Sequence, residues 1–210
     1  MHSDDAIRTA ATAQGLKTKR NNLIAAILSG LTLLAISIVV VPHVKISTTG
    51  FLLGAVAGFL YANGFEYCLH RFLLHSGRGV FSQQHMVHHN TLQSPEAARY
   101  VNFSSNPWGV VALFFANAVP FLILEWITRA AWITGIFPSF ALYYVAFEEI
   151  HWRSHMGGWL PRSVRLAARH HLRHHARDTG RFNVFLPIFD WIIELMPGLR
   201  PHDPGSRELR

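Results

Sequence analysis

The sequence predicts an all-α protein, a four-helix transmembrane bundle with a cytosolic helical cap. Half of the 210 residues are hydrophobic and only 15% are charged, a balance that is unusual for a soluble domain and typical of a membrane protein. The hydrophobic residues are also gathered into four long runs, which are separated by connections of sharply different lengths. The formal net charge of +7 could indicate nucleic-acid binding. However, the basic residues form no stripe with interleaved aromatic residues, so we expect no nucleic-acid partner.

The chain opens with a polar segment, residues 1–22, which has no signal-peptide pattern and which we expect to be a tail. Four apolar runs follow, each close to the roughly 20 residues that a helix needs to cross a bilayer. They cover about residues 23–41, 49–69, 108–127 and 131–150. We expect residues 23–196 to form a single domain and residues 197–210 to form a polar carboxyl-terminal tail.

The connections between these runs predict the topology. Residues 42–47 and 128–129 are short turns, whereas residues 71–107 and 151–210 are long and polar. Four spans would place both long segments and both termini on one face of the membrane. All of the 19 basic residues except Lys45 and Arg129 fall on that face, so the positive-inside rule makes it cytoplasmic. The alternative is four buried helices of a soluble protein, which the length and apolarity of the first and third runs disfavour.

Histidines are the most informative polar residues. Ten of the 14 fall into four motifs on the expected cytoplasmic side: HRFLLH, HMVHH, HWRSH and HLRHH. The motif histidines are His70, His75, His85, His88, His89, His151, His155, His171, His174 and His175. His2, His43 and His202 lie apart, and His170 adjoins the last motif as a spare or outer-sphere group. The single cysteine, Cys68, excludes an intramolecular disulfide and a cysteine-based zinc site.

The spacing of the motifs predicts metal binding. Positions i, i+3 and i+4 share one face of a helix, so each HxxHH projects three imidazoles into one arc and HWRSH projects two. His70 and His75 are five residues apart, and an ideal helix rotates them by about 140°. They could therefore serve different metals, or a bulge where the helix leaves the membrane could bring them together. A pH-sensing cluster would need no such spacing.

The two histidine pairs begin where the second and fourth runs end, so a helical hairpin can return the chain and let all four motifs converge. Ten nitrogen donors exceed what one ion needs, and imidazole suits iron, zinc, copper and nickel. We therefore expect the cap to hold a di-metal site with four or five nitrogens for each ion. A metal transporter is a rival, but transporters place their ligands near the bilayer midplane, and these motifs gather at one surface.

The ordered set HxxxxH, HxxHH, HxxxH, HxxHH resembles the fatty acid hydroxylase superfamily of membrane di-iron enzymes, which includes sterol desaturases and carotenoid hydroxylases. The resemblance runs over about residues 64–196. The stretch EYCLHRFLLH, residues 66–75, looks like the fatty acid 2-hydroxylase version of the first motif, whereas residues 182–191 are closer to the sterol desaturase-like branch. Only nine residues separate the first pair from the first triple, which is shorter than expected for the eukaryotic 2-hydroxylases.

This resemblance implies that the ten motif histidines ligate two iron ions, which zinc could replace during purification. It also implies an O2-dependent oxidoreductase that attacks an unactivated C–H bond of a membrane lipid, with a fatty acyl chain as the expected substrate. No haem-binding module is fused to the motifs, so a separate electron-transfer protein is expected to supply the electrons. Desaturation or hydroxylation of a sterol or carotenoid at the same site is the alternative.

Three acidic residues are candidates for supporting the ligands. Glu66 lies four residues before His70, Glu148 three before His151, and Asp178 four after His174. These spacings would let each carboxylate accept the second ring N–H of a ligand, although each could equally be a surface acid near the basic interface. The apolar run 182–196 is expected to be either an interfacial lid and acyl-chain entrance or an anchor of the cap on the membrane.

Overall fold

The computed structural model describes residues 2–40, 47–177, 180–196 and 199, and within them all regular structure is helical. The α-helices are α1 (His2–Val40), α2 (Thr48–Cys68), α3 (Gly79–Thr91), α4 (Pro107–Thr128), α5 (Ile136–Met156), α6 (Arg162–Arg177) and α7 (Ile188–Glu194). A π-helix, η1 (Leu69–Leu74), extends α2, and two 3-10 helices are η2 (Ala97–Arg99) and η3 (Ala131–Gly135). His43, His202 and most of the expected carboxyl-terminal tail lie outside the described residues.

The amino-terminal segment is not a tail: it forms the first half of α1, which is continuous over 39 residues. This half of α1 packs against η2, because small residues at the contact let the two elements approach closely. A Cβ atom at Gly15 would lie 2.2 Å from the Ala98 carbonyl oxygen, and Asn102 donates to the Gly15 carbonyl at 2.9 Å. Lys19 adds an ion pair with Glu149 at 2.6 Å. These contacts give a polar sequence enough partners to stay helical beyond the apolar run.

Three helices are long and apolar enough to cross a membrane: Ser3–Val39, Thr48–Leu74 and Pro107–Thr128. This fits a membrane protein. The fourth expected span, residues 131–150, is divided between η3 and α5, and α5 is not among the three. The reason is its composition, because its carboxyl-terminal half carries Glu148, Glu149, Arg153 and two histidines. That α5 crosses the membrane remains a prediction.

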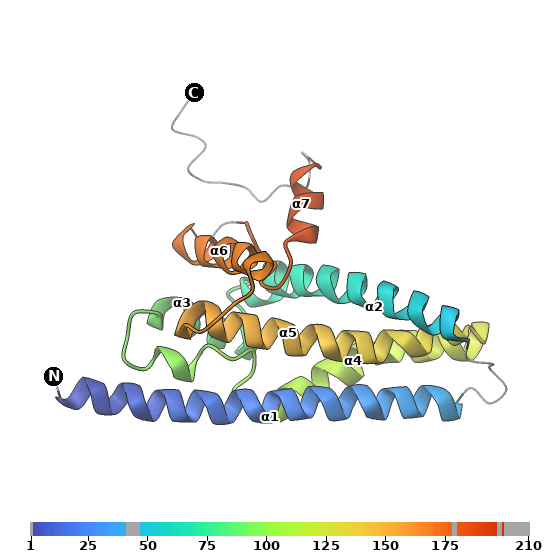
Figure 1. Ribbon diagram of the computed structural model, residues 1–210, viewed down its shortest axis with the longest axis horizontal. Coiled ribbons are helices and arrows are strands. Elements are labelled where there is room, and N and C mark those ends of the chain that lie inside the picture. Colours follow the sequence, from blue (N-terminus) through green and yellow to red (C-terminus); the bar gives the residue numbers. More distant parts are fainter. Residues whose placement is uncertain (1, 41–46, 178–179, 197–198, 200–210) are drawn as a thin grey trace.

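Helix α5 is nevertheless central to the bundle, since it packs against both α1 and α2 (Figure 1). Aromatic side chains fill the interior, where Phe114 of α4 meets Phe140 of α5 edge-to-face at a centroid distance of 5.0 Å. Near the start of α2, this helix and η3 approach closely. A Cβ atom at Gly54 would lie only 1.6 Å from the Trp132 carbonyl oxygen. The contact of α2 with η3 therefore fixes α2 against the start of α5, which follows η3.

Of the two expected short turns, residues 128–129 are described in full and residues 42–47 only at Ser47. Residues 41–46 lie outside the described residues, but Ser47 caps α2 by accepting a hydrogen bond from the Gly50 backbone nitrogen at 3.0 Å. Arg129 ends α4 in the left-handed region, with φ of 56°, and its backbone nitrogen donates to the Glu125 carbonyl at 2.8 Å. The chain then reverses directly into η3, as a short connection requires.

The remaining elements gather where α2 and α5 end. Helices α3 and α6 lie at the same end of the bundle as the amino terminus of α1, and α7 stands across the direction of α2 (Figure 1). Helix α3 contacts η1, α6 contacts α5, and α7 contacts α2. All four histidine motifs are therefore brought to one end of the molecule.

Candidate metal centre

The first histidine pair is brought together by the π-helix η1. His70 lies within η1 and His75 follows it directly, and the backbone nitrogen of His75 donates to the His70 carbonyl at 3.2 Å. This i→i+5 hydrogen bond takes an extra residue into the turn, so two side chains that would diverge on an ideal helix lie on one side. Their ring centroids are 5.1 Å apart. Of the two arrangements that the sequence left open, the structure has the bulge.

The ten motif histidines form two groups of five, and within each group the candidate ligand atoms all lie within 4.8 Å of one another. The first group is His70, His75, His85, His89 and His174; the second group is His88, His151, His155, His171 and His175. Each HxxHH motif is divided between them. Its outer two histidines, at i and i+4, stay in one group, and the middle one crosses to the other. We expected the three histidines of each HxxHH motif to lie together. Two of the three do, and the third lies in the other group.

The spacing of the nitrogens fits a metal ion in each group. In the first group the Nε2 atom of His85 lies 3.0 Å from the Nε2 atoms of His70, His75 and His89. In the second, the Nε2 atom of His171 lies 3.0 Å from those of His155 and His175. Donors about 2.1 Å from one ion and at right angles to each other would be about 3.0 Å apart.

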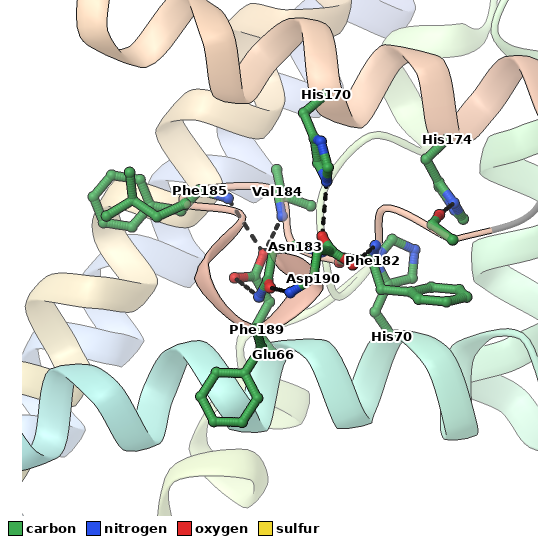
Figure 2. A network of polar contacts seen from close by, with 12 residues as sticks. Glu66, His70, His170, His174, Phe182, Asn183, Val184, Phe185, Phe189 and Asp190 are labelled. Atoms are coloured by element: carbon green, nitrogen blue, oxygen red, sulfur yellow. Dashed lines mark hydrogen bonds and ion pairs between the residues drawn. The ribbon is translucent and has the colours of Figure 1, made fainter. Parts of the chain in front are cut away.

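The protonation of the rings also fits. Burial, with the neighbouring imidazoles, lowers the pKa of His174 to about 3 and the pKa of His171 well below its ordinary value. Neutral imidazole is the form that binds a metal. His174 donates its Nδ1 hydrogen to the Gly180 carbonyl at 2.7 Å, and His70 donates its Nδ1 hydrogen to the Phe182 carbonyl (Figure 2). Their Nε2 atoms therefore carry lone pairs that point toward the Nε2 atoms of neighbouring rings, an arrangement that suits a metal ion.

Two of the three acidic candidates bind elsewhere. Glu66 is buried and accepts hydrogen bonds from the backbone nitrogen of Val184 at 2.6 Å and the side chain of Asn183 at 3.1 Å, as Figure 2 shows. Tyr143 also donates to it. The expectation that Glu66 accepts a hydrogen bond from a histidine ring is thus corrected. Its oxygens accept hydrogen bonds from the segment that follows Phe182, whose carbonyl accepts from His70.

Glu148 is buried as well, and its partners are the Asn22 side chain and the Phe103 backbone nitrogen, each at 3.3 Å. Like Glu66, it supports a loop beside the histidines and makes no hydrogen bond to a histidine ring of the described residues. The third candidate, Asp178, lies outside the described residues.

Sequence reasoning did not find Asp190, which is buried within the apolar run 182–196. Its carboxylate accepts from the backbone nitrogens of Phe182 and Asn183, both at 2.9 Å, and from the His170 ring at 2.8 Å. His170 therefore acts as a partner of Asp190 in the described structure (Figure 2). A usable signal was present, since Asn183 and Asp190 are the two polar side chains of the stretch 182–191.

Comparison with known proteins decides the family. The family model described as "Fatty acid hydroxylase" matches residues 55–194. The chain belongs to the fatty acid hydroxylase family. No curated protein and no solved structure matches it. The matched residues include all ten grouped histidines, and membership in the fatty acid hydroxylase family implies an oxidoreductase with membrane-lipid hydroxylase or desaturase-like activity.

In this member of the fatty acid hydroxylase family, a narrow cavity of about 40 Å³ touches both groups of histidines. His70 and His85 of the first group and His88, His151 and His171 of the second line it. Its other walls include Leu69, Leu74, Phe103, Phe147 and Val184. A second cavity of about 40 Å³, lined by Phe65, Leu113 and Phe140 among others, shares Leu69, Phe103 and Phe147 with the first. The two cavities therefore lie next to each other, one beside the histidines and the other inside the bundle.

Proposed function

We propose that this chain is an O2-dependent di-iron monooxygenase that hydroxylates a membrane lipid, with a fatty acyl chain as the substrate. The observation that carries the proposal is the pair of five-histidine groups beside one apolar cavity. Each group would hold one iron ion through its five imidazoles. Zinc would bind the same nitrogen donors and could replace iron in purified protein.

The overall reaction converts a C–H bond, O2, two electrons and two protons into an alcohol and water. The two bound iron ions would supply the oxidant for the unactivated C–H bond. The chain itself would hold the target carbon beside the histidines and exclude bulk water. The apolar side chains of Leu69, Phe103 and Phe147 line this position and suit a hydrocarbon.

The small volume of the cavity favours an acyl chain over a ring system. The space between the packed side chains is about 40 Å³, and a flexible methylene chain would enter it with less rearrangement of these side chains than a rigid ring system would. The exposed apolar side chains of Trp191, Leu195 and Met196, at and just beyond the end of α7, would place this segment in the membrane interface. From there it could admit a lipid or anchor the cap.

The electrons would come from a separate electron-transfer protein. The outer face of α6 offers it a binding surface, because Arg162, Arg165, Arg169 and Arg173 are exposed and form no ion pair with the described residues. The inner face of the same helix carries the buried rings of His171 and His174. An acidic donor bound there would lie about one helix diameter, roughly 10 Å, from the metal ligands.

We further propose an integral, multi-pass arrangement in which α5 is the fourth span and the histidine groups and both termini are cytoplasmic. The distribution of basic residues supports this orientation. The span would be residues 131–150, which η3 and the first part of α5 form and which ends before the ligands His151 and His155. Twenty helical residues correspond to a length of about 30 Å, close to the thickness of a bilayer core. The alternative activity, on a sterol or carotenoid, would use the same histidines and would differ in how the substrate carbon is placed.

The decisive experiment is isotopic. Reduced, iron-loaded enzyme in lipid nanodiscs should convert a long-chain acyl lipid under ¹⁸O2 to a product with a labelled hydroxyl group. Label that enters from water would instead indicate a metal-bound hydroxide and a hydrolytic site, and would refute the proposal. A new double bond without label would favour the desaturase alternative, and preferred turnover of a sterol or carotenoid would replace the acyl substrate.

A further inference from the structure

One segment, residues 180–189, orients rings of the first group of histidines; we name it the strap. Its Gly180 and Phe182 carbonyl oxygens accept the Nδ1 hydrogens of His174 and His70. Both of these histidines belong to the first group. A hydrogen bond at Nδ1 sets the tautomer and the rotation of the ring and so directs the Nε2 lone pair.

The strap is fixed at one end by Asp190. This carboxylate binds the backbone nitrogens of Phe182 and Asn183 at 2.9 Å and is itself held by the His170 ring at 2.8 Å. Asp190 thus binds the backbone nitrogen of Phe182, and the carbonyl oxygen of the same residue accepts the hydrogen bond from His70. Figure 2 shows this chain of contacts, from His170 through Asp190 to the strap.

The strap is fixed along its length by α2. Glu66 accepts from the backbone nitrogen of Val184 at 2.6 Å. Asn63 donates to the Leu186 carbonyl at 2.7 Å, and Asn183 donates to the Asn63 carbonyl at 2.9 Å. The side chains of Asn63, Glu66, Asn183 and Asp190 are all buried, so water does not compete for these hydrogen bonds and the strap is held in one conformation.

The second group has no comparable support in the described part of the chain. The Nδ1 atoms of His88, His171 and His175 are buried there without a hydrogen-bond partner. The ring of His151 approaches one backbone carbonyl, that of Val101, without a hydrogen bond of normal geometry. These rings are positioned by packing, and their tautomers are not set by an acceptor.

We infer that the two metal positions are unequal: the strap makes the first group the tighter position, which fills first and empties last. Asp190 and Glu66 are then positioning residues that act on the metal through the strap. This inference rests on the proposed binding of two metal ions. Loss of such an outer hydrogen-bond partner typically weakens metal binding by about 10–100-fold.

Metal release from the full chain in detergent tests this directly. Protein loaded with Zn²⁺ is equilibrated with increasing chelator, and bound metal is measured by mass spectrometry. The wild type should release two equivalents in two separate steps. His155→Ala, in the second group, should remove the weak step, and His75→Ala, in the first group, should remove the tight one.

The strap itself is tested with Asp190→Ala, which should weaken the tight step by about 10–100-fold and leave the weak step in place. His170→Ala removes one hydrogen bond of Asp190 and should shift the same step by less, which keeps the test usable if Asp190→Ala does not fold. Glu96→Ala, which breaks the half-exposed ion pair with Arg99, is the control and should change neither step.

Two equivalents released in a single step would overturn the inference and leave the di-metal proposal intact. The inference would also be overturned if Asp190→Ala and His170→Ala weakened only the second step or both steps equally. Wild-type protein that binds fewer than two equivalents would overturn the inference and the di-metal proposal together.

Discussion

His88 and His174 occupy the same middle place in their HxxHH motifs, and each lies in a group with two histidines of the other HxxHH motif and one histidine pair. Their rings reach across: the Nε2 atom of His88 lies 3.2 Å from that of His175, and the Nε2 atom of His174 lies 3.0 Å from that of His75. Neither group can therefore be complete unless α3 and α6 are both docked. Metal binding and docking of these helices are expected to be coupled.

This crossing predicts which ion each substitution removes. His88→Ala, on α3, should abolish metal binding by the second group. His174→Ala, on α6, should weaken metal binding by the first group. Each variant should retain about one equivalent of metal and lose turnover, because the reaction needs both ions. Metal analysis of the two variants with the single-group variants His75→Ala and His155→Ala as references checks this. If His88→Ala behaved like His75→Ala, the crossing would be refuted.

Metal-free protein should lose stability as the pH falls below about 6.5. Burial lowers the pKa of His174 from its ordinary value of 6.5 to about 3. Between these values the unfolded chain binds a proton that the folded chain does not, so the free energy of unfolding falls as the pH falls. Above pH 7 the His174 ring is neutral in both the folded and the unfolded chain, so it no longer makes the free energy of unfolding depend on pH.

Thermal unfolding at pH 7.5 and pH 5 measures this effect. The metal-free protein should melt at a lower temperature at pH 5 than at pH 7.5. Metal is left out because bound metal adds a separate stabilisation of the folded state by mass action. A melting temperature of metal-free protein that is unchanged, or that rises on acidification, would contradict the prediction.

Gly54→Leu should destabilise the bundle strongly. The new side chain would begin 1.6 Å from the Trp132 carbonyl oxygen, so α2 and η3 would have to separate. Overpacking of this kind typically costs about 1–3 kcal/mol, and a rigid backbone atom makes the upper value the expected one. Val56→Leu is the matched control, because Val56 is on the same helix and 60% exposed. Equal melting temperatures for the two variants would show that this close approach is absent.

Reversing charge on the outer face of α6 should impair electron delivery. The double variant Arg165→Glu/Arg169→Glu should lower turnover driven by an acidic donor protein by about tenfold or more, because the complementary field is lost. Turnover driven by dithionite should be unchanged. Arg20→Glu, an exposed position on α1, is the control. If both reductants support equal turnover in the double variant, the donor binds elsewhere.

Reporter fusions test the orientation. A reporter at Arg210 should indicate the cytoplasm, and one inserted near Lys45 should indicate the opposite side, as the basic residues predict. The same side for both would mean an even number of crossings between residues 45 and 210, so that α5 would not be the fourth span.

Local spacing made much of the centre predictable from the sequence. Residues at i and i+4 of a helix are neighbours wherever the helix lies, so the pairs His85/His89 and His171/His175 could be recognised before any packing was known. Runs of apolar residues likewise predict spans by length alone, and three of the four expected runs lie in helices of that kind. The ordered motifs were also enough to indicate the family that the comparison confirms.

Tertiary structure alone decided how the histidines are divided and held. Whether His88 joins its own motif or the opposite one depends on how α3 and α6 pack, which spacing within one helix does not contain. His70 and His174 donate to backbone carbonyls. Every residue has a backbone carbonyl, so the residue types in the sequence could not predict which ones accept these hydrogen bonds. Glu66 was a candidate by spacing, but its buried oxygens went to the backbone of residues 184 and 185, because unpaired backbone N–H groups inside a protein need an acceptor.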